Sequence, residues 1–158
     1  SIMPDKARKL DLSAILFKPE PPSGTGTRCT TAQDHKIDEV LDRELIKKTS
    51  GAVEKAERIE LEMPIRNVNR TTGAMLSGNI CSVRGERGLP DDTINVKFKG
   101  VSGQSFGAFL ARGVTFELEG LANDYVGKGI SGGKVIIYPD RTSDYPAEGN
   151  ILIGNTTF

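Results

Sequence analysis

The sequence has few of the side chains that metal and redox sites use. Its 158 residues include one histidine, two cysteines and no tryptophan. These cannot supply the four Cys/His ligands of a zinc site or the spaced cysteine set of an iron–sulfur cluster. Because Cys29 and Cys81 lie far apart and no signal segment opens the chain, we interpret both as free thiols in a reducing compartment. The composition therefore argues against a metal-binding domain.

The chain also lacks an excess of charge and any long apolar run. Lysine and arginine total 21 and so do aspartate and glutamate, which gives a net charge of zero. Such a chain has no net field to attract nucleic acid or an anionic membrane, and no segment approaches the roughly 18 apolar residues of a spanning helix. We expect a protein of the cytoplasm, or of a reducing organelle such as a plastid, that is not secreted and binds neither nucleic acid nor membranes.

The 18 glycines are distributed unevenly. Three precede residue 73 and nine lie between Gly100 and Gly133. Residues 1–33 combine proline, serine and glycine with one short apolar patch, formed by Leu10, Leu12, Ile15, Leu16 and Phe17. A stretch of this composition cannot build its own core. We therefore expect an extended arm or linker that lies on some other surface.

Residues 34–57 predict a helical linker. Apolar residues between 34 and 48 follow the i, i+3, i+4, i+8 spacing of an amphipathic helix, at Ile37, Val40, Leu41 and Leu45. Asp34 is the expected N-cap, and Gly51 is expected just beyond the C-terminus. After this helix, residues 59–65 alternate between apolar and polar side chains, which predicts a strand with one buried face.

From residue 66 onward, short β-rich runs recur between glycine-rich turns. Their centres, at Ile80, Phe98, Phe116, Ile137 and Ile153, are 18, 18, 21 and 16 residues apart. A period near 20 predicts a solenoid in which each coil pairs in parallel with the next. No crossover helix is visible, which argues against a doubly wound sheet. We therefore predict a mainly β protein, with a parallel β-helix over residues 58–158.

The corners of such a solenoid need a positive φ or close backbone stacking, which glycine and asparagine tolerate. The corner residues we predict are Gly103, Gly107, Gly120, Asn123, Asp124, Gly127, Gly129, Gly132 and Gly133. All are assigned a structural role. We predict no catalytic, cofactor-binding or metal-binding residue in this chain.

Two motifs resemble binding sites. Residues 127–132 match GxGxxG, but a Rossmann fingerprint requires a helix after the loop, and here a strand-like run follows. The cluster at residues 123–125 could line a groove with a carboxylate and an amide. We favour an Asx turn with the Tyr125 ring packed beneath it, because Asp124 has no evident carboxylate partner for acid–base catalysis.

Three further features are weaker. Asp91 and Asp92 are adjacent carboxylates, which we interpret as a turn and strand start rather than a metal site. His35 and Cys29 could form a nucleophile dyad, but nothing in their surroundings would exclude water. Cys81 lies in an apolar run and is expected to be a small buried side chain.

The β-rich half resembles a known family. The resemblance rests on residues 64–73 (PIRNVNRTTG), 88–94 (GLPDDTI), 103–110 (GQSFGAFL), 122–129 (ANDYVGKG) and 131–134 (SGGK). Together these segments are similar to the C-terminal, glycine-motif domain of the glutamate synthase large subunit. Residues 9–13 and 41–46 resemble the segment that precedes this domain. Leu121, where the family usually has an acidic residue, and Val101-Ser102, where it usually has Ser-Ala, depart from the pattern.

The resemblance implies a right-handed β-helix that serves as a non-catalytic scaffold. It further implies a parent enzyme that releases ammonia from glutamine and adds it reductively to 2-oxoglutarate, with FMN and a 3Fe-4S cluster on other domains. The expected partners are the amidotransferase, central and FMN-binding domains of the same chain. Since the family continues past residue 158 and this chain lacks an initiator methionine, we expect a fragment with an incomplete C-terminal end.

An incomplete β-helix would leave an open apolar edge, through which two copies of the chain could associate. Two other interpretations remain. One is a glycine-motif subunit of a formylmethanofuran dehydrogenase-type complex, against which the linker over residues 9–46 speaks. The other is an independent carbohydrate-binding β-helix, which should show clustered charged side chains on one solvent-facing sheet. No such stripe is expected from the sequence.

Overall fold

The computed structural model describes residues 9–157 and divides the chain into two compact units, Ser1–His35 and Lys36–Phe158. The described residues of the first unit form turns but no helix or strand. In one turn, the carbonyl of Leu12 accepts hydrogen bonds from the N–H groups of Ile15 and Leu16, at 3.0 and 2.8 Å. The apolar side chains around this turn are exposed to solvent, so residues 9–35 form no core of their own.

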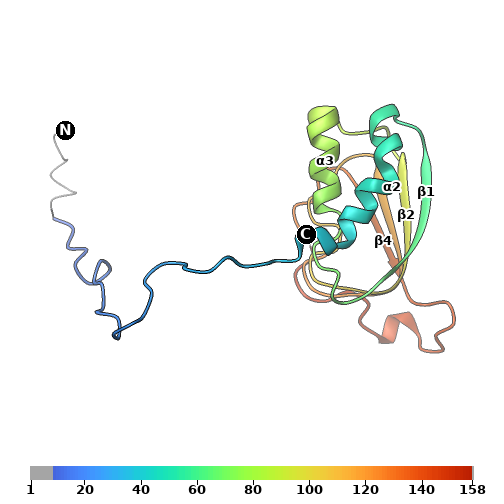
Figure 1. The fold of residues 1–158 in the computed structure, drawn as a ribbon. Helices are drawn as coiled ribbons and strands as arrows, with labels where there is room; N and C mark the ends of the chain where they lie inside the picture. Colours follow the sequence, from blue (N-terminus) through green and yellow to red (C-terminus); the bar gives the residue numbers. More distant parts are fainter. Residues whose placement is uncertain (1–8, 158) are drawn as a thin grey trace. The chain divides into compact units, whose positions relative to one another are not determined.

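The described residues of the second unit, 36–157, form two helices, four strands and three short 3-10 turns, and Figure 1 shows their arrangement. In chain order these are η1 (Ile37–Glu39), α2 (Leu41–Lys55), β1 (Ile59–Ile65), α3 (Ala74–Arg84), η2 (Gly85–Arg87), β2 (Ile94–Ser102), β3 (Val114–Ala122), β4 (Lys134–Tyr138) and η3 (Ala147–Gly149). The unit is therefore mixed α/β.

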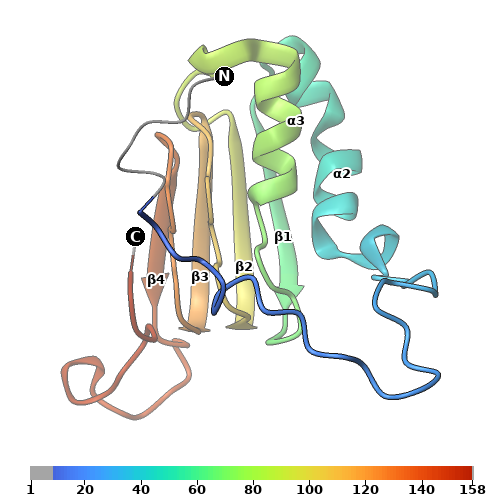
Figure 2. The ribbon, with the colours of Figure 1, turned by 90° about the vertical axis from the view of Figure 1, so that its left-hand side faces the viewer.

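The four strands form one parallel sheet in the order β1-β2-β3-β4. Their register aligns Met63, Phe98, Leu118 and Ile137 in one row across the sheet. Helices α2 and α3 lie on one side of the sheet, and neither covers the opposite face (Figures 1 and 2). We call the helix side the inner face.

The connections between strands differ in kind. The crossover from β1 to β2 contains α3, whereas residues 103–113 and 123–133 join the later strands without a helix. These two connections are hydrogen bonded to each other. The N–H groups of Ser105, Gly127 and Phe109 donate to the carbonyls of Asp124, Phe106 and Lys128, at 2.8 to 2.9 Å. The connections therefore stack in the same order as the strands.

One corner position recurs through this stack. Thr71, Ser105, Tyr125 and Thr156 all adopt left-handed conformations, with φ between 55° and 64°. Three of them donate an N–H to the next layer, at 2.8 to 3.0 Å, to the carbonyls of Gln104, Asp124 and Asn155. A left-handed conformation is costly for a residue with a β-carbon, so the stacked hydrogen bonds must stabilise it.

The core lies between the inner face and the two helices. Three phenylalanine rings, Phe98, Phe106 and Phe116, meet at centroid separations of 5.0 to 5.5 Å. The helices contribute fully buried aliphatic side chains, namely Leu45 and Val53 from α2 and Leu76 and Ile80 from α3. Burial of a side chain of this size stabilises a fold by about 1.5 to 3 kcal/mol.

A buried carboxylate joins the two helices at their N-terminal ends. Asp42, in the first turn of α2, is 3% exposed. Its two oxygens accept hydrogen bonds from the N–H groups of Gly73, Met75 and Leu76, at 2.8, 2.7 and 3.2 Å. These N–H groups lie at the start of α3 and have no acceptor within the helix. Gly73, the N-cap residue, has no side chain that could accept a hydrogen bond from them. Burial raises the pKa of Asp42, and the three N–H bonds oppose that rise.

The C-terminal ends are joined by an arginine. Arg84, the last residue of α3, donates from Nε to the carbonyl of Val53 at 2.7 Å and from Nη2 to that of Glu54 at 2.6 Å. Both carbonyls belong to the last turn of α2, where a positive charge is favoured by the helix dipole. Since like ends meet at both positions, α2 and α3 run parallel, and each helix supplies the cap that the other lacks.

The prediction of a mainly β, right-handed parallel β-helix is wrong. The structure has a four-stranded parallel sheet with two helices, one of which forms the crossover from β1 to β2. Parallel pairing of successive strands is confirmed for β2, β3 and β4. Ile80, which we had taken as a strand centre, lies in α3.

Helix α3 could not be predicted from its own residues. It contains Gly78 and the β-branched Ile80 and Val83, which are modest helix formers, and the capping side chain comes from Asp42, 31 residues upstream. Its formation therefore depends on tertiary contacts rather than on a local signal.

The predicted boundaries of the first helix are also wrong. Helix α2 begins at Leu41, so its N-cap residue is Val40 and not Asp34. The helix continues through Gly51 and ends at Lys55. Burial of Ala52 and Val53 extends the helix beyond the glycine. The strand predicted at residues 59–65 is confirmed as β1.

Replacing the carboxylate that caps α3 should destabilise the fold. We expect Asp42→Ala to lower the free energy of unfolding by about 2 to 4 kcal/mol, because three buried N–H groups lose their acceptor. Urea denaturation followed by circular dichroism measures this. The matched control is Glu44→Ala on the same helix, whose exposed pair with Lys48 at 2.9 Å should contribute less than about 0.5 kcal/mol. Equal effects of the two substitutions would contradict the capping role.

Candidate functional site

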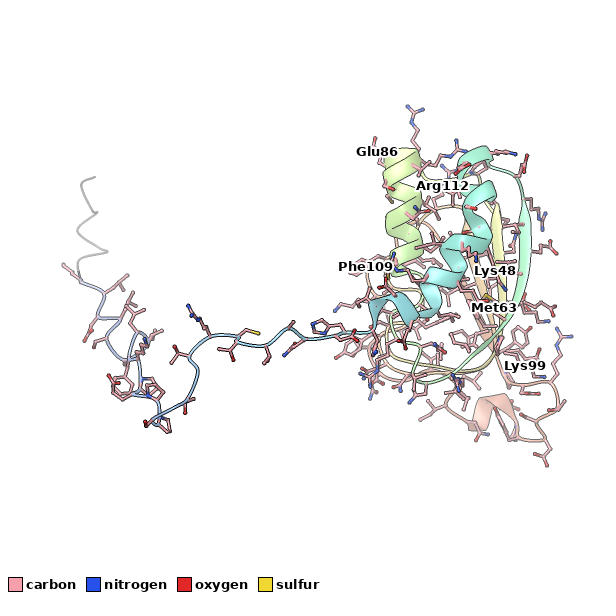
Figure 3. The ribbon with its side chains drawn as sticks, in the orientation of Figure 1. Lys48, Met63, Glu86, Lys99, Phe109 and Arg112 are labelled. Carbon is pink, nitrogen blue, oxygen red and sulfur yellow. The ribbon has the colours of Figure 1, made fainter. Side chains whose placement is uncertain are left out.

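The outer face of the sheet, opposite α2 and α3, carries a group of charged side chains from three neighbouring strands. Alternation along the strands directs every second side chain away from the core. The charged residues that share this orientation are Glu60, Glu62, Lys97, Lys99, Glu117 and Glu119, and we call this surface the charged face. Figure 3 shows Lys99 on the side of the sheet that the helices leave open.

Acidic and basic groups alternate along the charged face. Lys97 Nζ lies 4.0 Å from Glu117 Oε1 and 3.9 Å from Glu119 Oε2. Lys99 Nζ lies 3.5 Å from Glu119 Oε1 and 3.6 Å from Asp140 Oδ2. The result is an ion-pair ladder across β2 and β3 that reaches the residues after β4. Partly exposed pairs of this kind contribute at most about 1 kcal/mol each.

Tyr138, the last residue of β4, and Arg141, which follows the strand, complete the ladder. The N–H of Arg141 donates to Glu119 Oε1 at 3.2 Å, and the Tyr138 hydroxyl donates to Glu117. The Arg141 N–H, helped by the Lys99 ammonium, lowers the pKa of Glu119. The bond to Glu117 raises the pKa of Tyr138. Glu119 is therefore ionised at neutral pH and cannot act as a proton donor.

Two hollows lie on this face. The larger, of about 450 Å³, is lined by Glu62, Lys97, Lys99 and Glu119 together with parts of β1 and β2. The smaller, of about 310 Å³, extends towards Arg58, Glu60, Asn95, Thr115 and Glu117. The two share Glu62 and Lys97, so they are neighbouring hollows of one face.

Eight of the nine predicted corner residues lie in the stacked connections 103–113 and 123–133. They are Gly103, Gly107, Asn123, Asp124, Gly127, Gly129, Gly132 and Gly133, whereas Gly120 lies within β3. Asn123 Nδ2 donates to Asn67 Oδ1 at 3.0 Å, and Asp124 Oδ1 accepts from the N–H of Asn155 at 2.8 Å. The side chains of Asn123 and Asp124 therefore bond to neighbouring groups of the same unit, a side-chain amide in the first case and a backbone N–H in the second.

Of the nine predicted corner residues, Gly120 has the least space for a side chain. Its φ is 146°, and a β-carbon at this position would overlap the carbonyl oxygen of Gly100 on the neighbouring strand. Gly100 itself has a φ of 133°. Strands β2 and β3 can approach this closely because Gly120 has no side chain. Gly100 allows a similar approach to β1, since a β-carbon there would overlap the carbonyl oxygen of Ile65.

The loop at residues 127–132 uses its amides internally. The N–H groups of Gly127, Ile130 and Ser131 donate to the carbonyls of Phe106, Gly127 and Leu110, at 2.8 to 2.9 Å. The next element is β4 rather than a helix. The arrangement lacks the free helix amides that hold a pyrophosphate.

The adjacent carboxylates Asp91 and Asp92 face different cations. Asp91 pairs with Arg112 Nε at 3.0 Å, whereas Asp92 accepts from Lys134 Nζ at 2.8 Å and from Thr115 Oγ1 at 2.7 Å. They precede β2 and link it to the next two layers, which agrees with a turn and strand-start role.

Two expectations about single side chains are wrong. Asn123 Oδ1 accepts from the N–H of the next residue, Asp124, at 2.9 Å, rather than from the second residue along as in the predicted Asx turn, and Tyr125 is 41% exposed and not packed beneath. Cys81 is exposed on α3 rather than buried. Cys29 and His35 are exposed residues of the first unit, and the Cys29 thiol donates to the carbonyl of Thr31.

Within residues 9–157, the structure holds no group of three or more His, Cys, Asp and Glu side chains arranged to bind a metal ion. In the same part of the chain, no helix is long and apolar enough to cross a membrane.

A family model described as the GXGXG motif matches residues 42–158. The chain belongs to the GXGXG motif family. It is 47% identical over 154 residues to Glutamate synthase (NADH) of Schizosaccharomyces pombe, which covers 96% of this chain and 7% of that protein. It is 43% identical over 158 residues to Glutamate synthase (NADH) of Saccharomyces cerevisiae, and the match covers 97% of this chain and 7% of that protein. It is 41% identical over 155 residues to the Glutamate synthase (NADPH) large chain of Bacillus subtilis, and the match covers 97% of this chain and 10% of that protein.

The GXGXG chain thus spans 7 to 10% of the length of these relatives. The resemblance to a domain of the glutamate synthase large subunit is confirmed. The segments that carried it surround the stacked connections, where the backbone geometry restricts the side chains most.

The charged face of this GXGXG chain was missed in the sequence, and the expectation that no charged stripe exists is wrong. The signal was present: β1 carries Glu60 and Glu62, β2 carries Lys97 and Lys99, and β3 carries Glu117 and Glu119. In each strand, two charges of one sign are separated by one residue, and the sign reverses from strand to strand. Recognising it required the parallel register as well as the strands themselves.

Substitution by alanine should change the free energy of unfolding in opposite directions at two glycines of this chain. We expect Gly120→Ala to lower the free energy of unfolding by about 3 kcal/mol or more, because the new methyl group would overlap the Gly100 carbonyl. Gly78→Ala, at an exposed helical position with open space around it, should raise it by up to about 1 kcal/mol. Thermal and urea unfolding of both variants test this. A stable, unshifted Gly120→Ala protein would refute the close approach of β2 and β3.

Proposed function

We propose that this chain is a structural, non-catalytic domain of a glutamate synthase. The observation that supports the proposal most strongly is its match, over 96 to 97% of its residues, to a short part of much longer proteins of that name. A domain within a large enzyme contributes through its surfaces. Its charged groups are accordingly paired with one another.

The larger enzyme would make glutamate from glutamine and 2-oxoglutarate. In this proposal, an amidotransferase domain releases ammonia from glutamine, and a domain with FMN and a 3Fe-4S cluster carries out the reductive addition. Neither group fits the residues of this chain. Iron–sulfur clusters require a set of cysteine thiolates, and the two cysteines here lie in different units. In the glycine loop, the N–H groups of residues 127, 128, 130 and 131 are already bonded to backbone carbonyls.

We further propose that the charged face contacts another domain of that enzyme. Parallel sheets are found almost only with both faces covered, whereas the outer face here has no covering helix or strand in the described residues. The alternating ladder of Lys97, Lys99, Glu117 and Glu119 would suit a polar, hydrogen-bonded interface rather than an apolar one.

The same ladder argues against carbohydrate hydrolysis. A glycosidase needs one carboxyl group that stays protonated near neutral pH, next to one that is ionised. The pKa of Glu119 is lowered, and its neighbour Glu117 faces Lys97. The charged face therefore gives no support to carbohydrate hydrolysis. It is the charged stripe expected of a carbohydrate-binding β-helix, but the structure has a four-stranded sheet with two helices in place of that fold.

Activity assays test the non-catalytic role. The purified chain, supplied with FMN, should show neither glutamine hydrolysis nor glutamate formation from 2-oxoglutarate above the buffer rate. The large chain of Bacillus subtilis glutamate synthase, assayed in parallel, provides the positive control. Robust turnover by this chain alone would overturn the structural assignment.

A chimera tests the role of the charged face. Residues 36–158 should replace the matching segment of the Bacillus subtilis large chain with retention of glutamine-dependent glutamate formation. In that chimera, Lys97→Glu with Lys99→Glu should reduce activity more than Lys47→Glu, a charge reversal on the exposed side of α2. Equal activities in these two folded variants would remove the charged face from the interface.

A further inference from the structure

The loop that follows β1, residues 66–70, is held in place by hydrogen bonds, and we call it the arginine loop. Its turn is closed by the N–H of Arg66 to Asn69 Oδ1 at 2.9 Å and by the N–H of Asn69 to the carbonyl of Arg66 at 2.8 Å. The Asn69 carbonyl accepts from the N–H of Gly103 at 3.1 Å, and Asn67 Oδ1 accepts from Asn123 Nδ2 at 3.0 Å. The arginine loop is therefore fixed to both stacked connections.

The arginine loop also lies in close contact with the end of β2. A β-carbon at Gly103 would lie 2.5 Å from the carbonyl oxygen of Asn67 and 2.7 Å from that of Asn69. It would lie 3.0 Å from Arg70 Cγ, so the aliphatic stem of this arginine rests against the glycine. Because Gly103 has no side chain, the loop backbone and the Arg70 stem can pack directly on it.

The outward side chains of the arginine loop make no bond within the described unit. Arg66, Val68 and Arg70 are exposed, and Val68 is 74% exposed. Within residues 9–157, neither guanidinium forms an ion pair or a side-chain hydrogen bond. Other arginines of the unit do bind a carboxylate or a carbonyl, namely Arg43, Arg58, Arg84 and Arg112.

A fixed backbone that presents unpaired arginines is typical of an interaction site. Arginine is enriched where protein surfaces bind each other, and a loop that is already ordered loses little conformational entropy on binding. The ordering of this loop is costly to explain by the fold alone, since its three outward side chains do not contribute to the core.

We propose that Arg66, Val68 and Arg70 dock on an acidic surface of another domain of the synthase. The inference rests on the proposed function, because the partner belongs to the part of the larger enzyme that lies outside this chain. Two guanidinium groups that have no carboxylate of their own are complementary to carboxylates on the partner, which arginine can bind with two parallel hydrogen bonds. Val68 between them favours a protein surface over a phosphate backbone, because it adds apolar contact area.

This contact is separate from the charged face. The lysines and glutamates of the charged face are paired with one another across β2 and β3, whereas the arginines of the loop have no such partners. The arginine loop therefore has more unsatisfied charge to offer to a second domain.

Charge reversal in the Bacillus subtilis chimera tests the docking. Arg66→Glu with Arg70→Glu should reduce glutamine-dependent glutamate formation by about tenfold or more, because carboxylates would then face carboxylates. The matched control is Lys47→Glu with Arg87→Glu, which reverses two exposed cations on α2 and η2 of the same unit. Equal activities of the two double variants would overturn the proposal.

Thermal unfolding separates docking from a role within the unit. In the isolated chain, Arg66→Ala with Arg70→Ala should shift the unfolding temperature by less than about 2 °C, because neither guanidinium is bonded there. In the chimera, the same change should lower the unfolding temperature more than Lys47→Ala with Arg87→Ala does. A large loss in the isolated chain, or no difference between the two pairs in the chimera, would contradict docking.

The unsubstituted chimera distinguishes the two proposals. If it is unfolded or inactive, the proposed function is contradicted and the partner surface is removed with it. If it is active and tolerates reversal of both arginines, only the docking of the arginine loop is contradicted.

Discussion

The buried carboxylate of Asp42 is the interaction on which the helical layer depends. It occupies the N-terminal end of α3, where three backbone N–H groups would otherwise have no acceptor. Arg84 performs the converse function at the far end, where it binds the last carbonyls of α2. The two parallel helices bring like dipole ends together, and the carboxylate and guanidinium offset that repulsion. Neither helix is capped by its own sequence alone.

This coupling explains why the two faces of the sheet differ. Once α2 and α3 are joined, Leu45, Val53, Leu76 and Ile80 form one apolar surface over the inner face. The outer face receives no helix and satisfies its charges by the ladder across β2 and β3. A domain built in this way presents a polar outer surface, which suits the contact with another domain that we propose.

Local features of the sequence predicted local features of the structure. Strict alternation identified β1, and the apolar runs identified the parallel pairing of the later strands. Helix α3 could not be predicted, because its cap comes from Asp42 in another helix and its own residues include Gly78 and β-branched side chains. The end of α2 was misplaced because burial of Ala52 and Val53 outweighs the cost of Gly51. The charged face could have been found from the paired glutamates and lysines, but only with the strand register in hand.

Native-state hydrogen exchange of the Asp42→Ala variant tests the dependence of α3 on α2 most directly. If the carboxylate holds α3 in place, amides of residues 74–84 should lose protection while the β2–β3 ladder keeps most of its own. The loss should extend to the last turn of α2, because Arg84 can no longer reach Val53 and Glu54 from a frayed helix. Unchanged protection of residues 74–84, or an equal loss across helices and sheet, would contradict this account.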